Sequence, residues 1–111
     1  MKEPIIVSNF GDILLFSSAI AAEGYLELVD VKNNEYTAYD CEGRLLNFKI
    51  FTKEGVESFE IVAAEEHPNH TDELAKATVH FLSRVGESEQ KLSQLSLNVL
   101  LEILKKYALI R

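Results

Sequence analysis

The sequence has little of what covalent scaffolds and most reaction centres require. It contains one cysteine, Cys41, so no disulfide can close within the chain, and an oxidising compartment is not needed. Its five glycines stand singly at turn positions, and the motifs GxxxxGK[ST], GxGxxG and GxSxG are all absent. Cradling of phosphate groups by a glycine-rich loop therefore has no support in this chain.

Long apolar runs are also missing. Ile13–Phe16 is far shorter than the roughly 20 residues that a membrane-spanning helix needs. Ile5–Val7 is too short for the core of a secretory signal peptide. We therefore expect a cytoplasmic protein that has no membrane partner.

Positive charge is scarce. The chain has 11 Lys and Arg residues against 18 Asp and Glu residues, a net charge of −7. Such a chain repels phosphate backbones, so we expect no nucleic-acid partner. It attracts basic proteins and speeds their encounter, although the same charge would also serve solubility alone.

Length and composition predict a single α+β domain over residues 1–111, because 47% of the residues are hydrophobic and no linker interrupts the pattern. Turn residues and alternating apolar positions predict an antiparallel β-meander of about four to five strands. The expected strands are Ile5–Ser8, Ile13–Phe16, Glu35–Tyr39, Leu45–Thr52 and Val56–Ala63, with Leu28–Val31 as a further candidate.

Three helices are expected around this sheet. A short N-terminal helix over Ala19–Tyr25, capped by Ser17 or Ser18, should bury Ile20 and Tyr25. Two C-terminal helices should pack on one face of the sheet, as is usual when strands come first and long helices last. The first follows Thr71, and the second follows the cap Ser88. Its expected apolar stripe comprises Leu92, Leu95, Val99, Leu100, Ile103 and Tyr107.

One histidine pair could bind a metal ion. His67 and His70 lie three residues apart among acidic residues, and imidazoles with carboxylates are suitable zinc ligands. His80, on the following helix, is a possible third ligand. A small metal-dependent enzyme is therefore one hypothesis. The same residues equally suit a solvated acidic loop before a helix, so we assign no metal ligand and no cofactor.

No residue set specifies a catalytic reaction. Cys41 stands between Asp40 and Glu42, which stabilise the neutral thiol rather than the reactive thiolate. The acidic pairs lie in polar segments, whereas a carboxyl group that acts as a general acid needs an apolar pocket. We therefore expect no enzymatic activity.

Acidic residues gather in two segments. Residues 54–73 hold seven acids and no Lys or Arg, and residues 23–42 hold six acids and only Lys32. Tyrosines beside carboxylates suit an interface with a cationic protein, although one tyrosine could equally belong to the core. The predicted partner-binding residues are Asp30, Glu35, Tyr36, Tyr39, Asp40, Glu42, Glu65 and Glu66.

The sequence YLELVDVKNNEY at 25–36, with YDCEGRLL at 39–46, resembles small bacterial immunity proteins encoded beside polymorphic or contact-dependent toxins. The resemblance covers roughly the first fifty residues. It implies a protein that binds and neutralises a cognate toxin, and the acidic charge of this chain implies a basic toxin domain. A homodimeric structural module is the remaining alternative, joined through a sheet edge or through the last helix and its apolar end Leu109–Ile110.

Overall fold

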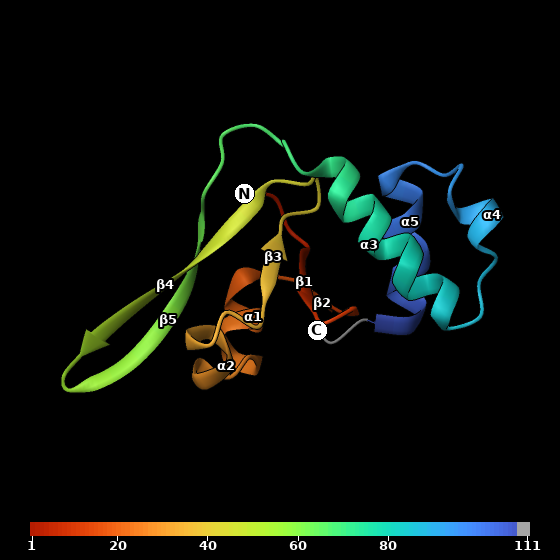
Figure 1. Ribbon diagram of the computed structural model, residues 1–111. Helices are drawn as coiled ribbons and strands as arrows, with labels where there is room; N and C mark the ends of the chain where they lie inside the picture. Colours follow the sequence, from red (N-terminus) through yellow and green to blue (C-terminus); the bar gives the residue numbers. More distant parts are fainter. Residues whose placement is uncertain (109–111) are drawn as a thin grey trace.

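A computed structural model describes residues 1–108 of the chain. It contains five strands and five helices (Figure 1). In chain order these are β1 Ile5–Asn9, β2 Asp12–Phe16, α1 Ala19–Tyr25, α2 Leu28–Lys32, β3 Thr37–Tyr39, β4 Leu45–Lys53, β5 Val56–Ala63, α3 Thr71–Arg84, α4 Glu89–Leu92 and α5 Leu97–Ala108.

The strands form one antiparallel sheet with the order β2-β1-β3-β4-β5. This confirms the predicted α+β fold. The simple meander is limited to β3, β4 and β5, because β1 lies between β2 and β3 and pairs with both. The segment that carries α1 and α2 makes the connection from β2 across β1 to β3.

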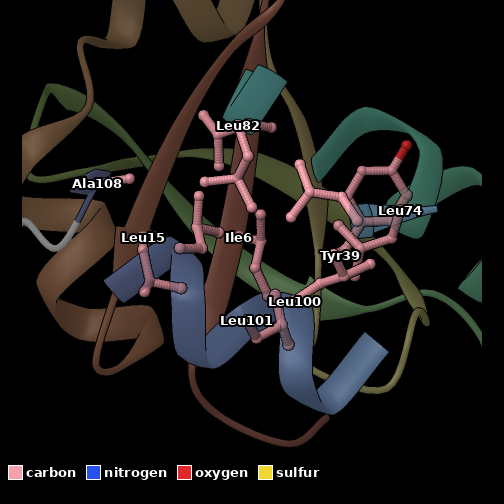
Figure 2. Close-up of a cluster of buried hydrophobic side chains, with 11 residues drawn as sticks. Ile6, Leu15, Tyr39, Leu74, Leu82, Leu100, Leu101 and Ala108 are labelled. Carbon is pink, nitrogen blue, oxygen red and sulfur yellow. The ribbon is translucent and has the colours of Figure 1, made fainter. Parts of the chain in front are cut away.

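Two hydrophobic cores lie on opposite faces of the sheet. On one face, Ile6, Leu15 and Tyr39 pack against Leu74 of α3 and Leu104 of α5, in the cluster that Figure 2 shows. On the other face, neighbouring strand residues pack against α1 and α2, together with side chains of β4 and β5. Successive strand residues point to opposite faces, so the continuous apolar run Ile5–Val7 supplies both cores.

The hairpin of β4 and β5 extends well beyond the rest of the molecule (Figure 1). Its strands pair from Leu46 with Ala63 to Lys53 with Val56, and a two-residue turn joins them. Both turn residues have positive φ, 53° at Glu54 and 77° at Gly55. This is the turn geometry whose twist matches that of paired strands.

The predicted strand Leu28–Val31 is wrong, because these residues begin helix α2. The backbone N–H of Val31 donates to the carbonyl of Glu27, and that of Asn33 donates to Val29, both at 3.1 Å. β-Branched residues are only slightly unfavourable in helices, and burial of Val31 in the core outweighs that preference. The next predicted strand is also shorter than expected, since β3 begins at Thr37.

The predicted burial within the helices also needs correction. Ala22 faces the core in α1, whereas Ile20 and Tyr25 are exposed. The expected last helix is divided into α4 and α5, with the break at residues 93–96. Its buried residues are Leu92, Leu100, Leu101, Leu104 and Ala108, whereas Leu95, Val99 and Tyr107 are exposed. The apolar end Leu109–Ile110 lies outside the described residues.

Candidate protein-interaction surface

The eight predicted partner-binding residues separate into two groups at the two ends of β3. Asp30, Glu35 and Tyr36 lie at the end where α2 leads into the strand. The other group lies at the end where β3 turns into β4 and approaches the start of α3. It consists of Tyr39, Asp40, Glu42, Glu65 and Glu66.

Asp40 organises the turn between β3 and β4 from a fully buried position. Its Oδ1 accepts hydrogen bonds from the backbone N–H of Glu42 at 3.0 Å and of Arg44 at 2.9 Å. Its Oδ2 accepts from the backbone N–H of Lys2 at 3.0 Å and from the Arg44 guanidinium at 3.2 Å. Burial alone would raise the pKa of Asp40, but these backbone donors and Arg44 together lower it.

Glu42 and Glu66 extend this turn to the surface. Glu42 forms an ion pair with the Arg44 guanidinium, whose hydrogen bond lowers the pKa of Glu42. Lys2 adds a second contact to Glu42 at 3.5 Å. The Glu66 side chain is exposed, and its backbone carbonyl accepts a hydrogen bond from Arg44 Nε at 3.0 Å.

Glu65 joins the turn to the loop that carries both histidines. Its Oε1 accepts a hydrogen bond from the backbone N–H of Leu45 at 2.6 Å and lies 2.8 Å from His70 Nδ1. The Leu45 donor lowers the pKa of Glu65, with a further contribution from His70. His67 and His80 are exposed. Within residues 1–108, no three His, Cys, Asp or Glu side chains gather closely enough to hold a metal ion.

Tyr39 belongs to the core rather than to the surface. It is 3% exposed, and its hydroxyl donates a hydrogen bond to the Glu73 carboxylate of α3. Burial, and then the negative charge of Glu73, raise the pKa of Tyr39. In Figure 2 its ring lies beside Leu74. The contact ties β3 to the first turn of α3.

The group at the other end of β3 is more open. The Tyr36 hydroxyl donates to Asp30 Oδ2 at 3.1 Å, and its ring packs against Phe48 with centroids 6.1 Å apart. Desolvation raises the pKa of Glu35, and the neighbouring Asp30 charge raises it further. Among the described residues, neither Asp30 nor Glu35 forms an ion pair. Two acids therefore stand close together without a neutralising cation.

Sequence reasoning missed three exposed apolar side chains on the α1–α2 segment. Ile20 is 80% exposed, Val29 is 61% exposed and Tyr25 is 54% exposed. One signal was available, because a helix whose core side is formed by small alanines must turn its larger side chains elsewhere. Ala22 is fully buried and lies two positions from Ile20, which places Ile20 on the opposite side of the helix.

A hollow of about 330 Å³ lies between this segment and the hairpin. One wall of the hollow is formed by α2 and the residues that follow it, and the opposite wall is formed by β4. The lining residues are Val31, Lys32, Asn34, Tyr36, Thr37, Leu45, Leu46, Asn47, Phe48 and Ile50. Lys32 also reaches β5, where its Nζ lies 2.6 Å from Glu57 Oε1.

Cys41 is half-buried in the turn after Asp40. Burial raises the pKa of its thiol, and the negative charges of Asp40 and Glu42 raise it further. The thiol is therefore held in its less reactive, neutral form.

Comparisons with protein-family models, curated proteins and solved structures found no match to this chain. No helix in the described part of the chain is long and apolar enough to cross a membrane.

Proposed function

We propose that this chain is an acidic protein-binding module that captures a basic partner, and that the partner is a bacterial toxin domain which this immunity protein neutralises in the cytoplasm. One observation carries the proposal. The α1–α2 segment exposes Ile20, Tyr25 and Val29 within a stretch whose acids are largely uncompensated. In this proposal the chain binds its partner and performs no reaction of its own.

Exposed aromatic and aliphatic side chains supply the short-range part of such an interface. Burying one of them completely contributes about 1.5–3 kcal/mol of transfer free energy. Tyr25 already packs against the buried Phe16, with the rings tilted and their centroids 5.5 Å apart. Its position is therefore set before a partner arrives, which reduces the entropy lost on binding.

Negative charge supplies the long-range part. Glu27, Asp30 and Glu35 form no ion pair within residues 1–108, so their field extends into solvent. A cationic partner would be steered to this side, and its association rate constant would rise at low ionic strength. The resemblance to immunity proteins includes residues 25–36, which overlap the same segment.

The proposed contact surface comprises Asp30, Glu35 and Tyr36 with the exposed apolar residues nearby. The acids around the β3–β4 turn have a structural role in this proposal. Asp40, Glu42 and Glu65 already accept hydrogen bonds from within the chain, so they hold the turn and leave fewer lone pairs for a partner. Glu66 is exposed and remains available.

A co-expression experiment tests the function. The protein encoded beside this chain's gene is expressed in bacteria with and without the chain, and growth is followed. We expect that protein to be toxic alone and harmless with the chain, and calorimetry to show a direct complex. A neighbouring protein that is harmless, or that stays toxic when the chain is present, would contradict the proposal.

Paired variants locate the surface. Ile20→Ser with Val29→Ser should weaken the complex at least tenfold, because two apolar anchors are lost. Val99→Ser is the matched control, since Val99 is an exposed apolar residue on α5, which packs on the other face of the sheet. Loss of binding by Val99→Ser, with binding retained by the double variant, would place the contact surface on the α5 side of the sheet and contradict the proposed surface.

A further inference from the structure

Strands β3 and β4 differ greatly in length. β4 has nine residues, whereas β3 has three and pairs with β4 only at Leu45 and Leu46. From Asn47 onward, β4 therefore has β5 on one side and, within residues 1–108, no strand on the other. The outer part of the hairpin presents an open strand edge beside the hollow.

The direction of the backbone groups follows from the register. In a hairpin with a two-residue turn, the pair that flanks the turn exchanges hydrogen bonds, and this pair is Lys53 with Val56. Bonded pairs alternate with unbonded ones along an antiparallel ladder. Phe48, Ile50 and Thr52 thus direct their N–H and C=O groups away from β5. The outer edge agrees with this register, because the N–H of Ile61, opposite Phe48, points away from β4 and donates to Glu23 at 2.7 Å.

In the described part of the chain, the backbone groups of Phe48, Ile50 and Thr52 make no hydrogen bond to a residue outside the sheet, and the register leaves them without a strand partner. A row of unsatisfied strand groups is a template for another strand. Glu23 covers part of the β5 edge on the other side of the hairpin, because its side chain accepts a hydrogen bond from the Ile61 N–H. The two edges of the hairpin therefore differ in how far they are covered.

The hollow gives this edge a place for side chains. Phe48 and Ile50 face it from the strand, and Val31 and Tyr36 face it from the opposite wall. A segment paired with β4 would direct every second side chain into this space, because strand residues alternate between faces. Those that meet the aromatic ring of Phe48 and the aliphatic Ile50 would be apolar, whereas Lys32, Asn34, Thr37 and Asn47 make other parts of the lining polar.

The acidic residues beside the hollow indicate that the added segment also carries a basic side chain. Glu35 lies between Asn34 and Tyr36, which both line the hollow, and Asp30 is hydrogen-bonded to Tyr36. A Lys or Arg placed two positions from an apolar residue would lie on the same side of an added strand and could reach these acids. The raised pKa of Glu35 reflects desolvation and repulsion by Asp30, and a cation would relieve that repulsion.

A second copy of this chain is a poorer occupant. Each copy has a net charge of −7. Antiparallel pairing of two β4 strands would also bring Lys49 and Lys53 of both copies to one face. Like charges at such positions destabilise strand pairing. The same edge favours a different protein of opposite charge.

We propose that an extended segment of the basic partner adds to the edge of β4 at Phe48–Thr52 as a sixth strand, with apolar side chains in the hollow and a basic side chain at Asp30 and Glu35. This inference rests on the proposed function for its partner. It goes further in naming strand addition as the mode of binding.

A designed peptide tests the mode of binding without the natural partner. The probe is an acetylated and amidated peptide, Thr-Val-Thr-Lys-Thr-Val-Thr-Lys-Thr, whose Val and Lys side chains share one face in a strand. We expect hydrogen exchange at the amides of Phe48, Ile50 and Thr52, followed by nuclear magnetic resonance, to slow at least tenfold with saturating peptide. Replacing each Lys by Glu should weaken binding at least tenfold.

Backbone methylation provides a matched control within the peptide. Methylating only the Thr amides and methylating only the Val and Lys amides block opposite edges of the same strand. One methylated peptide should lose at least tenfold in affinity, and the other should bind nearly as well as the parent. Equal binding by both would overturn strand addition.

Two variants of the chain, rather than of the peptide, test the same assignment of the edge. Thr52→Pro removes an N–H that faces the open edge without removing a bond to β5, so it should weaken peptide binding about tenfold, as expected for one lost hydrogen bond with its steric cost. Ala63→Pro is the control on the outer edge of β5. Weakening by Ala63→Pro but not by Thr52→Pro would contradict the assigned edge.

The outcomes separate the two proposals. Binding of the neighbour-encoded toxin without slowed exchange at Phe48, Ile50 and Thr52 would overturn strand addition and leave the proposed function standing. Strand addition with the peptide, but no complex with any neighbour-encoded protein, would overturn the proposed function alone. Slowed exchange in the chain by itself, together with a doubled mass in light scattering, would identify a second copy as the occupant and overturn the partner assignment.

Discussion

Gly43 in the β3–β4 turn lies directly against Thr71, the first residue of α3. A Cβ atom added to Gly43 would lie 2.5 Å from the Cα of Thr71, closer than real Cβ contacts allow. The Gly43 carbonyl accepts a hydrogen bond from the His70 N–H at 2.9 Å, and Thr71 Oγ1 donates to the Glu42 carbonyl at 2.7 Å. This contact docks the start of α3 on the sheet.

Gly43→Ala should be strongly destabilising. The residue has a φ of +94°, so alanine would meet both an unfavourable backbone conformation and the backbone of Thr71. Urea unfolding followed by circular dichroism should show a loss of about 3 kcal/mol or more, from strain and overpacking together. Gly55→Ala is the matched control, because Gly55 has a φ of +77° with nothing near its added Cβ. It should lose only about 1–2 kcal/mol, and equal losses would disprove the close contact.

Asp40→Asn should lower the free energy of unfolding by about 3 kcal/mol at pH 7, because it leaves the Arg44 guanidinium beside a neutral group and weakens several hydrogen bonds. The lowered pKa of Asp40 sets the pH dependence. The unfolded chain binds this proton more tightly, so the contribution is complete above the ordinary pKa of 3.8 and is lost as the pH falls below it.

Urea unfolding of the parent and Asp40→Asn at pH 7 and at pH 3 measures this contribution. The difference between the two proteins should shrink at the lower pH. Glu66→Gln is the control, because the Glu66 side chain is exposed and should change stability by less than about 0.5 kcal/mol. A difference between the parent and Asp40→Asn that grew toward pH 3 would contradict the assigned role of the carboxylate.

Cys41 should react slowly with iodoacetamide at neutral pH. Burial and the charges of Asp40 and Glu42 raise its pKa above the ordinary thiol value of 9.0, so little thiolate is present. Mass spectrometry of timed samples should show alkylation slower than that of free cysteine, and faster alkylation when urea unfolds the chain. Glu42→Gln should modestly increase the rate in the folded protein. A folded-state rate equal to the unfolded one would mean that the turn does not protect the thiol.

Ile20→Ser and Val29→Ser should leave stability almost unchanged, within about 0.5 kcal/mol each, because both side chains are already in water. Leu104→Ala should cost about 2–5 kcal/mol, since Leu104 is fully buried in the core of α3 and α5. Thermal and urea unfolding measure the contrast. A large destabilisation by Ile20→Ser would show that Ile20 supports the fold, and its effect on partner binding would then have a different explanation.

Asp30→Asn with Glu35→Gln should slow association with a basic partner and reduce its dependence on salt. The physical reason is that these acids contribute to steering, which is screened as ionic strength rises. Stopped-flow measurements at low and high salt give the association rate constants. Glu89→Gln is the control, because Glu89 is exposed on α4, which packs through Leu92 on the other face of the sheet. An unchanged rate for the double variant, with a reduced rate for Glu89→Gln, would move the steering surface elsewhere.

Much of the fold followed from the sequence because the deciding interactions are local. Helix α1 and strand β5 have the predicted bounds, and the Glu54–Gly55 turn lies between the predicted strands Leu45–Thr52 and Val56–Ala63. Alternation of side chains, capping by Ser18 and residues that tolerate positive φ act within a few positions. Such preferences can be read one segment at a time.

Other features depended on which surfaces met. Leu28–Val31 has the β-branched residues of a strand, yet packing of Val31 on the sheet selects a helix. Asp40 reads as a surface acid, yet donors from Lys2, Glu42 and Arg44 stabilise its charge in a buried position. Small Ala22, rather than the larger Ile20, faces the core. Each outcome depends in part on contacts between segments distant in sequence, as Lys2 is from Asp40.

By itself, the sequence determined the acidic charge, the α+β class and the positions of most turns, because composition and short-range backbone preferences are enough for these. Only the tertiary structure decided which acids are buried, which apolar side chains remain in water and where the edge of β4 stays open. Those properties arise when elements of unequal length pack together, since a three-residue strand cannot satisfy the backbone of a nine-residue neighbour.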